Sequence, residues 1–179
     1  IQGRYMHHPV SISWSSHCLV QRWRLEAPHR HGTTLSWSAH GNVFADGWGR
    51  NLAMDCHRAA SFQNLHTNIV IAQSPGRVIK PLRSGGKRGR GPHSARRNVY
   101  WNIEFKFHEK SPKTVLVSSH KQWPGGIFFG WHGNRTLDFR PVKGLDQQIV
   151  FLNKKASIVN LYKYQKQKQK KPDDSKRPH

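Results

Sequence analysis

The chain has 179 residues, of which 30 are Lys or Arg and only 9 are Asp or Glu, so its formal net charge is +21. This length suits one domain with tails, and this charge is typical of proteins that bind polyanions such as nucleic acid, anionic membrane surfaces or sulfated polysaccharides. Seven Trp and eight Phe exclude a wholly disordered basic chain, so we expect a packed core. No apolar run approaches the ~20 residues of a membrane-spanning helix, and no membrane insertion is expected.

Residues 1–17 contain an HHP sequence and a Ser cluster and are expected to be irregular. From residue 18 onward, apolar and polar residues alternate in short runs, which is typical of strands with one buried face. His40-Gly41-Asn42 separates two such runs and is expected to form a hairpin turn, because Gly and Asn tolerate positive φ. The expected strands include residues 18–20, 23–25, 34–37, 43–44, 52–54, 68–72, 99–107, 115–117, 127–129 and 149–152.

Many short strands and no amphipathic helix of three turns predict an all-β barrel or sandwich. Two segments lie outside this pattern. Residues 81–98 are Gly-rich and basic with no apolar face, and we expect a long exposed loop inserted between strands. Residues 159–179 are rich in Lys and Gln, which predicts a disordered tail.

Cys18 and Cys56 are compatible with one disulfide or with two free thiols. A bond between them would close a loop of ~38 residues and stabilise the fold by about 3–4 kcal/mol. Asn134-Arg135-Thr136 is an acceptor sequence for N-glycosylation. The first residue is Ile rather than Met, which removal of a signal peptide or trimming of the chain would explain. Together, these features favour a secreted protein with a glycan on Asn134 and a Cys18–Cys56 disulfide.

Sequence motifs for catalysis and metal binding are missing. The thirteen His residues form no HExxH or CxxC…HxxxH spacing, so no metal site and no cofactor are predicted. No nucleophile elbow, phosphate-binding loop or carboxylate pair is present, and two of the nine acidic residues are in the tail. We therefore expect a protein that is not an enzyme.

Residues 102–152 resemble the C-terminal third of a fibroblast growth factor. Upstream, residues 34–43 are similar to the early hairpin of this family and residues 68–71 to its central apolar strand. The resemblance spans residues 18–155 and implies a β-trefoil of about twelve short strands over residues 18–158. The residues that carry it are Phe105, Phe107, Glu109, Ser118, His120, the Ile127-Phe128-Phe129-Gly130 strand, the basic loop 131–148 and the closing Ile149-Val150-Phe151-Leu152.

The chain also departs from the family. The receptor-contacting tyrosine motif would fall at residues 113–116, which contain no Tyr, and the glycine box retains only Gly133 and Gly144. These departures concern the receptor contacts more than the fold. The inserted segment 81–98 has no counterpart in ordinary members.

A sulfated glycan is bound by several cations and amide donors that converge on one face. The basic loop and the residues just after it provide such a set, and backbone amides of the loop add further donors. The expected heparan-sulfate-binding residues are His132, Arg135, Arg140, Lys143, Gln147, Gln148, Lys154 and Lys155. A second polyanion candidate is the inserted loop, with Lys87, Arg88, Arg90, Arg96 and Arg97. Both sets are also compatible with a solvated basic surface that has no specific ligand.

The resemblance implies receptor contacts at Glu109, Leu116 and Leu152, although both leucines are equally compatible with core packing. The leading hypothesis is a secreted ligand that dimerises the ectodomain of a receptor tyrosine kinase, with heparan sulfate as co-ligand and a Klotho-like co-receptor as a further candidate partner. The main alternative is a basic RNA-binding protein such as an organellar ribosomal protein, with phosphate contacts and aromatic stacking on bases. A third hypothesis is a matrix module that only binds glycans.

Overall fold

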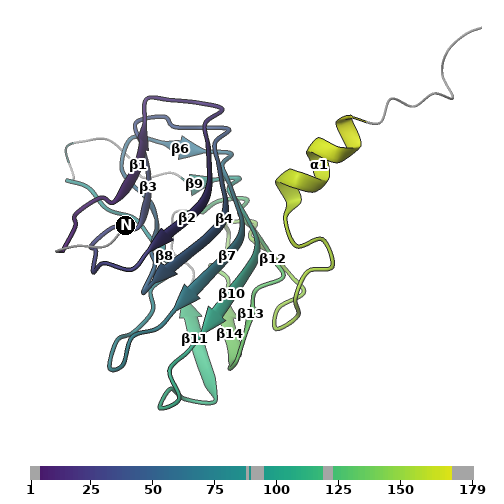
Figure 1. Ribbon diagram of the computed structural model, residues 1–179. Coiled ribbons are helices and arrows are strands. Elements are labelled where there is room, and N and C mark those ends of the chain that lie inside the picture. The colour runs from purple at the N-terminus through teal and green to yellow at the C-terminus, as the bar shows by residue number, and fades with distance from the viewer. Residues whose placement is uncertain (1–4, 88, 90–94, 119–122, 171–179) are drawn as a thin grey trace, which may run out of the picture.

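A computed structural model describes residues 5–87, 89, 95–118 and 123–170 of the chain. Its strands stack in parallel into a β-solenoid, in which each coil of the chain lies on the coil before it (Figure 1). The largest sheet contains, in spatial order, β15 (Gln148–Val150), β12 (Ile127–Phe129), β10 (Val99–Lys106), β7 (Leu65–Ala72), β4 (Val43–Arg50) and β2 (Leu19–Leu25), with β13 (His132–Gly133) also paired to β10.

Smaller sheets form the other sides of the solenoid. The second sheet contains β1 (Val10–Ser13), β3 (Thr33–Ser36), β5 (Met54–Cys56) and β8 (Leu82–Arg83) in that order. Two further pairs are β6 (Ser61–Phe62) with β9 (Ala95–Arg96), and β11 (Thr114–Ser118) with β14 (Thr136–Arg140). All strand pairings among the described residues are parallel.

The length of a coil follows from the register of the strands. Val43 pairs with Leu65, and Leu65 pairs with Val99, so these two coils take 22 and 34 residues. The longer coil contains the Gly-rich basic segment. Variation in coil length is therefore accommodated in the connections, while the strand register is kept.

A bend crosses the largest sheet at equivalent positions of four coils. Arg22, Asp46, Asn68 and Asn102 each have φ between 51° and 57°, and the ladder skips them while their neighbours pair. Asn and Asp adopt this left-handed conformation at less cost than most residues, because their short side chains bond locally. The repeated bend divides each of these long strands into two halves at the same position.

Aromatic rings stack along the solenoid axis inside the core. Phe44, His66, Tyr100 and Phe128 occupy one register, with ring-centroid separations of 5.0, 5.0 and 5.3 Å between successive rings. All four residues are buried. Burial lowers the pKa of His66 to about 3, so this imidazole is neutral in the native protein.

An asparagine ladder runs beside the aromatic stack. The side-chain oxygen of Asn42 accepts from the Cys18 N–H, that of Asn64 from the Asn42 N–H, and that of Asn98 from the Asn64 N–H, at 2.9, 3.0 and 2.9 Å. All three asparagines are buried just before a strand of the largest sheet. Each amide thus satisfies a backbone donor of the preceding coil, which parallel stacking would otherwise leave unpaired.

The all-β class is confirmed, but the predicted β-trefoil is wrong. The strands of a trefoil pair as antiparallel hairpins, whereas those of this chain pair in parallel. The turn at residues 40–42 illustrates the difference, because β3 before it and β4 after it belong to different sheets. Apolar alternation predicts a half-buried strand but not the direction of its partner.

Other parts of the predicted organisation also change. Strand β1 lies within residues 1–17, which were expected to be irregular, and helix α1 (Leu161–Gln169) lies within the predicted disordered tail. The inserted segment 81–98 contains β8 and β9, while its residues 88 and 90–94 lie outside the described residues. No helix in the described part of the chain has the length and apolar character needed to cross a membrane.

The predicted disulfide is absent: Cys18 and Cys56 are both free thiols. Cys18 precedes β2, whereas Cys56 lies in β5, in a different sheet, and is buried in the core. Burial raises the pKa of the Cys56 thiol to about 12, which keeps it protonated and unreactive.

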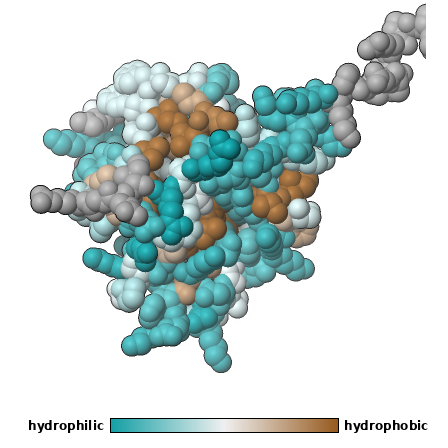
Figure 2. Space-filling model, viewed as in Figure 1, coloured by the Kyte–Doolittle hydropathy of each residue, from teal (hydrophilic) through white to brown (hydrophobic). Residues whose placement is uncertain are grey.

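Helix α1 projects from the solenoid beside the largest sheet (Figure 1) and is covered by hydrophilic residues (Figure 2). None of its residues is buried. It is held at its first turn, where the Asn160 side chain caps the Lys163 N–H and also donates to Asp46 Oδ1 at 2.7 Å. Lys163 Nζ lies 2.7 Å from Asp46 Oδ2.

Candidate functional site

A basic groove follows one edge of the solenoid, where the strands of the largest sheet end. The groove arises from unequal connections on successive coils. Seven residues (26–32) connect β2 to β3, three (51–53) connect β4 to β5, and nine (73–81) connect β7 to β8. Residues of all three connections line the groove.

The first section of this groove has a volume of about 560 Å³ and contains five cationic side chains. Arg30 comes from the first connection, Arg50 from the second coil, and the other three from the third coil. Its lining residues are Tyr5, Glu26, Pro28, His29, Arg30, Arg50, Asn51, Ala53, Ser74, Arg77, Val78, Lys80 and Arg83.

The groove continues along the same edge of the molecule. A second section shares Arg77 and Val78 with the first and extends over residues 108–112, in the connection from β10 to β11. A third section shares Glu109 and Ser111 with the second and ends at residues 133–136 and 153. We call these three adjoining sections the turn groove. Their further cations are Lys110, Lys113 and Arg135.

Most of the positive charge in the first section is uncompensated. No ion pair among the described residues involves Arg30, Arg50, Arg77 or Lys80, and all four side chains are exposed. The one carboxylate in this section, Glu26, contacts Arg24 outside the groove, and that contact lowers its pKa. Like charges so close together repel each other, so an anionic ligand would relieve an existing strain.

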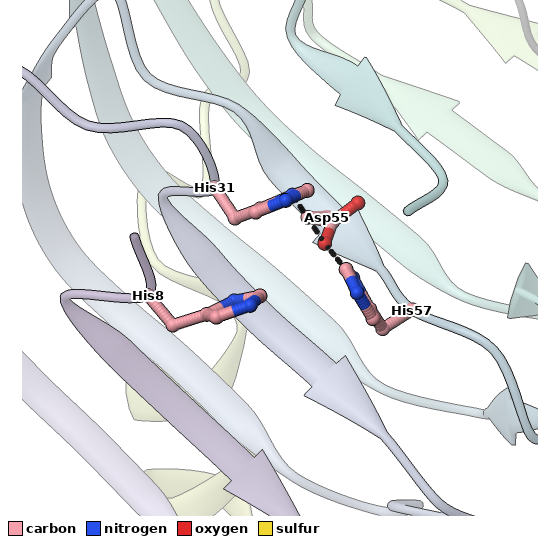
Figure 3. A group of neighbouring side chains, drawn as sticks. All are labelled: His8, His31, Asp55 and His57. Atoms are coloured by element: carbon pink, nitrogen blue, oxygen red, sulfur yellow. Dashed lines mark hydrogen bonds and ion pairs between the residues drawn. The ribbon is translucent and has the colours of Figure 1, made fainter. Parts of the chain in front are cut away.

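His8, His31, Asp55 and His57 form a cluster (Figure 3), and two of them are sequence or strand neighbours of residues that line the first section. Asp55 lies on β5 and His57 directly follows that strand, and the two side chains, two residues apart, point toward each other. His31 directly follows the groove residue Arg30, and Asp55 pairs in the sheet with the groove residue Arg83. His8 comes from the segment before β1, and its ring stacks on that of His31 at 4.5 Å.

Asp55 is at the centre of this cluster and is fully buried. His57 Nδ1 donates to Asp55 Oδ2 at 2.5 Å, and His31 Nδ1 lies 3.0 Å from the same oxygen without forming a hydrogen bond of good geometry. Burial alone would raise the pKa of Asp55, but the two histidines outweigh it and lower that pKa. Burial and the neighbouring His31 and His57 lower the pKa of His8 to about 4.

The heparan-sulfate-binding residues predicted from the sequence do not come together in one site. Only Arg135 lines the turn groove, and its guanidinium donates to the carbonyl oxygens of Glu109, Ser111 and Asn134. Arg140 pairs with Asp138, and the Gln147 amide bonds the backbone of Trp123 and Val142. The remaining predicted residues, His132, Lys143, Gln148, Lys154 and Lys155, are half-buried or exposed outside the groove lining.

The predicted receptor residues are also separated. Glu109 lines the turn groove, Leu116 is 52% exposed on β11, and Leu152 packs partly against the core. In the second basic loop, Lys87, Arg96 and Arg97 are exposed, while Arg88 and Arg90 lie outside the described residues. Asn134, the predicted glycosylation residue, uses its side chain to bridge the backbone N–H and carbonyl of Phe107.

The turn groove and the His–Asp cluster were not predicted from the sequence. Their residues match no local motif, because they come from several coils that are far apart along the chain. His8, His31 and Asp55 are spaced by 23 and 24 residues, close to the length of one coil. A search for residues that recur at the coil length would have brought them together.

Comparison of the chain with protein-family models, with curated proteins and with solved structures gives no match.

Proposed function

We propose that this protein binds a linear acidic polysaccharide along the turn groove. The observation that carries the proposal is the contribution of uncompensated cations by three successive coils: Arg30, Arg50, and then Arg77 with Lys80. A solenoid repeats its surface along one axis, and its concave faces suit extended ligands. Sulfate and carboxylate groups are well suited to arginine, because its planar guanidinium can donate hydrogen bonds to two of their oxygens at once.

The spacing of the coils suits an extended polysaccharide, and the side chains of the groove do not suit a single-stranded nucleic acid. Neighbouring strands in a sheet lie about 4.8 Å apart, so equivalent side chains of successive coils repeat at that distance. This is close to the length of one sugar unit in an extended polysaccharide, so an acidic group on each sugar would meet one coil after another. Single-stranded nucleic acids are bound largely through stacked aromatic residues, and the first groove section contains only Tyr5 of that kind.

Receptor signalling stays a prediction. The contact residues of that hypothesis come from a resemblance to trefoil proteins, whereas this chain forms a solenoid. In the solenoid, Glu109 lines the turn groove, Leu116 is exposed and Leu152 packs partly against the core. Glycan binding was also part of that hypothesis, and we now propose it for the cations of the turn groove. Secretion and glycosylation of Asn134 also stay predictions.

The proposal is tested with a groove variant and a variant of equal charge. The groove variant carries Arg30→Gln, Arg50→Gln and Arg77→Gln, and the control carries Arg140→Gln, Lys143→Gln and Lys154→Gln. Both lose three positive charges, so any difference between them reports position rather than net charge. Binding of heparin, polygalacturonate and single-stranded RNA is measured at several salt concentrations, since generic charge attraction falls steeply with salt.

We expect the groove variant to lose at least about tenfold in affinity for one of the glycans, and the control to lose less than about threefold, because only the groove cations contact the ligand. A preference for heparin identifies sulfate as the recognised group, and a preference for polygalacturonate identifies carboxylate. Equal losses in the two variants would overturn the proposal, and so would tighter binding of RNA than of either glycan at every salt concentration.

A further inference from the structure

We infer that His8, His31, Asp55 and His57 form a binding site for a divalent transition-metal ion. The nitrogen or oxygen ligand atoms of these four residues all lie within 4.8 Å of one another. In a tetrahedral site with bond lengths of about 2.0–2.2 Å, ligand atoms are roughly 3.3–3.6 Å apart, so small side-chain shifts would close the shell. Three imidazoles with one carboxylate suit Zn²⁺ and its neighbours, whereas Ca²⁺ and Mg²⁺ require oxygen ligands.

The strongest evidence for a cation here is an unsatisfied carboxylate. Asp55 is fully buried, yet its Oδ1 has no hydrogen-bond partner among the described residues, and neither does His31 Nδ1. Burying a charged group without enough partners is costly, and a metal ion would satisfy both atoms at once. The two atoms belong to the same cluster and so point to one ligand.

The surroundings close the cluster on one side and leave it accessible through His8. Gly85 lies on the next coil over the cluster, where an added Cβ would come within 2.2 Å of His57 Cε1 and 2.7 Å of His31 Cε1. A residue with any side chain at this position would displace both rings. On the other side, His8 is only half-buried, which gives an ion a route into the site.

Each ligand comes from a stretch of the chain that the fold holds in place. His31 lies just before β3, Asp55 lies on β5 with His57 directly after it, and His8 is carried by the segment that leads into β1. His8 also bonds Thr34 through Nδ1 at 3.0 Å, which leaves Nε2 as its ligand atom in this arrangement. A preformed site of this kind stabilises the fold when a metal binds it.

The test uses the whole chain, treated with a chelator, dialysed and titrated with ZnCl₂ in a calorimeter. We expect one tight site per chain and a raised unfolding temperature in the presence of Zn²⁺. His8→Ala removes one ligand at the exposed side of the cluster and should weaken that site at least tenfold. His17→Ala, which removes an exposed histidine elsewhere on the solenoid, controls for weak binding by the other histidines.

Gly85→Ala provides a second variant that keeps all four ligands. It should also weaken Zn²⁺ binding, because the added methyl group displaces the His57 and His31 rings. CaCl₂ in place of ZnCl₂ should give no tight site. The inference is overturned if the wild-type chain binds no Zn²⁺ tightly, or if His8→Ala and His17→Ala change the affinity equally.

Discussion

At the residue scale, buried polar side chains in this solenoid act as connectors between coils. Asn64 is the middle member of the asparagine ladder: it accepts from the Asn42 backbone and donates to the carbonyl oxygens of Ala39 and Phe62. No apolar side chain of similar size could do both. The amide therefore stabilises the stacking of three coils rather than one local turn.

Asn64→Ala should lower the free energy of unfolding by about 1–3 kcal/mol, because it leaves buried backbone groups without partners. Denaturant titration followed by tryptophan fluorescence measures this change. Gln148→Ala removes an exposed amide and serves as the control, with an expected change below about 0.5 kcal/mol. Similar effects of the two substitutions would show that the ladder contributes little to stability.

His66 couples the stability of the core to pH. Its folded pKa of about 3 lies far below the usual value near 6.5, so between these pH values the unfolded chain binds a proton that the native protein does not. The free energy of unfolding should therefore fall by about 1.4 kcal/mol for each pH unit below 6.5 because of this one residue.

His66→Phe should remove that contribution and continue the stack between Phe44 and Tyr100 with a neutral ring. Denaturant titrations at pH 4, 5, 6 and 7 compare the two proteins. We expect the difference in unfolding free energy to grow steadily in favour of the variant as pH falls. Parallel curves for the two proteins would contradict the assignment of a neutral buried imidazole.

At the element scale, a carboxylate of the sheet, Asp46, helps to hold the first turn of helix α1. Asp46 lies at the bend of β4 and accepts hydrogen bonds from Gln21, Asn68 and Asn160, besides its ion pair with Lys163. Burial alone would raise the pKa of Asp46, but these donors outweigh it and hold that pKa well below its usual range. Since its folded pKa is depressed, its stabilising effect is present above about pH 4 and is lost as pH falls further.

Asp46→Asn should therefore loosen the first turn of α1 and lower the free energy of unfolding by about 1–3 kcal/mol at neutral pH. Amide hydrogen exchange measures the helix directly, and residues 161–169 should exchange faster in the variant. Asp138→Asn, which breaks an exposed ion pair with Arg140, should leave the exchange of α1 unchanged. Unaltered exchange of α1 in Asp46→Asn would mean that the helix is held by other contacts.

At the scale of the whole molecule, the strands are more predictable from the sequence than their arrangement. The runs at residues 43–44, 68–72, 99–107 and 127–129 were predicted as strands and are strands, because alternating burial leaves a local pattern. Parallel pairing leaves no local pattern, since Val43, Leu65 and Val99 are neighbours only through the register of whole coils. The net charge predicted a polyanion ligand, but the position of the cations depends on the lengths of connections between coils.

The most direct test of the proposed glycan binding is amide hydrogen exchange of the whole chain with and without a heparin or polygalacturonate oligosaccharide. We expect added protection in the three connections that build the first groove section and the strand residues next to them, residues 26–32, 50–53 and 73–83, and little change in the predicted basic loop 131–148 beyond residue 136. Protection confined to residues 137–155, or none in the turn groove at saturating ligand, would contradict the account.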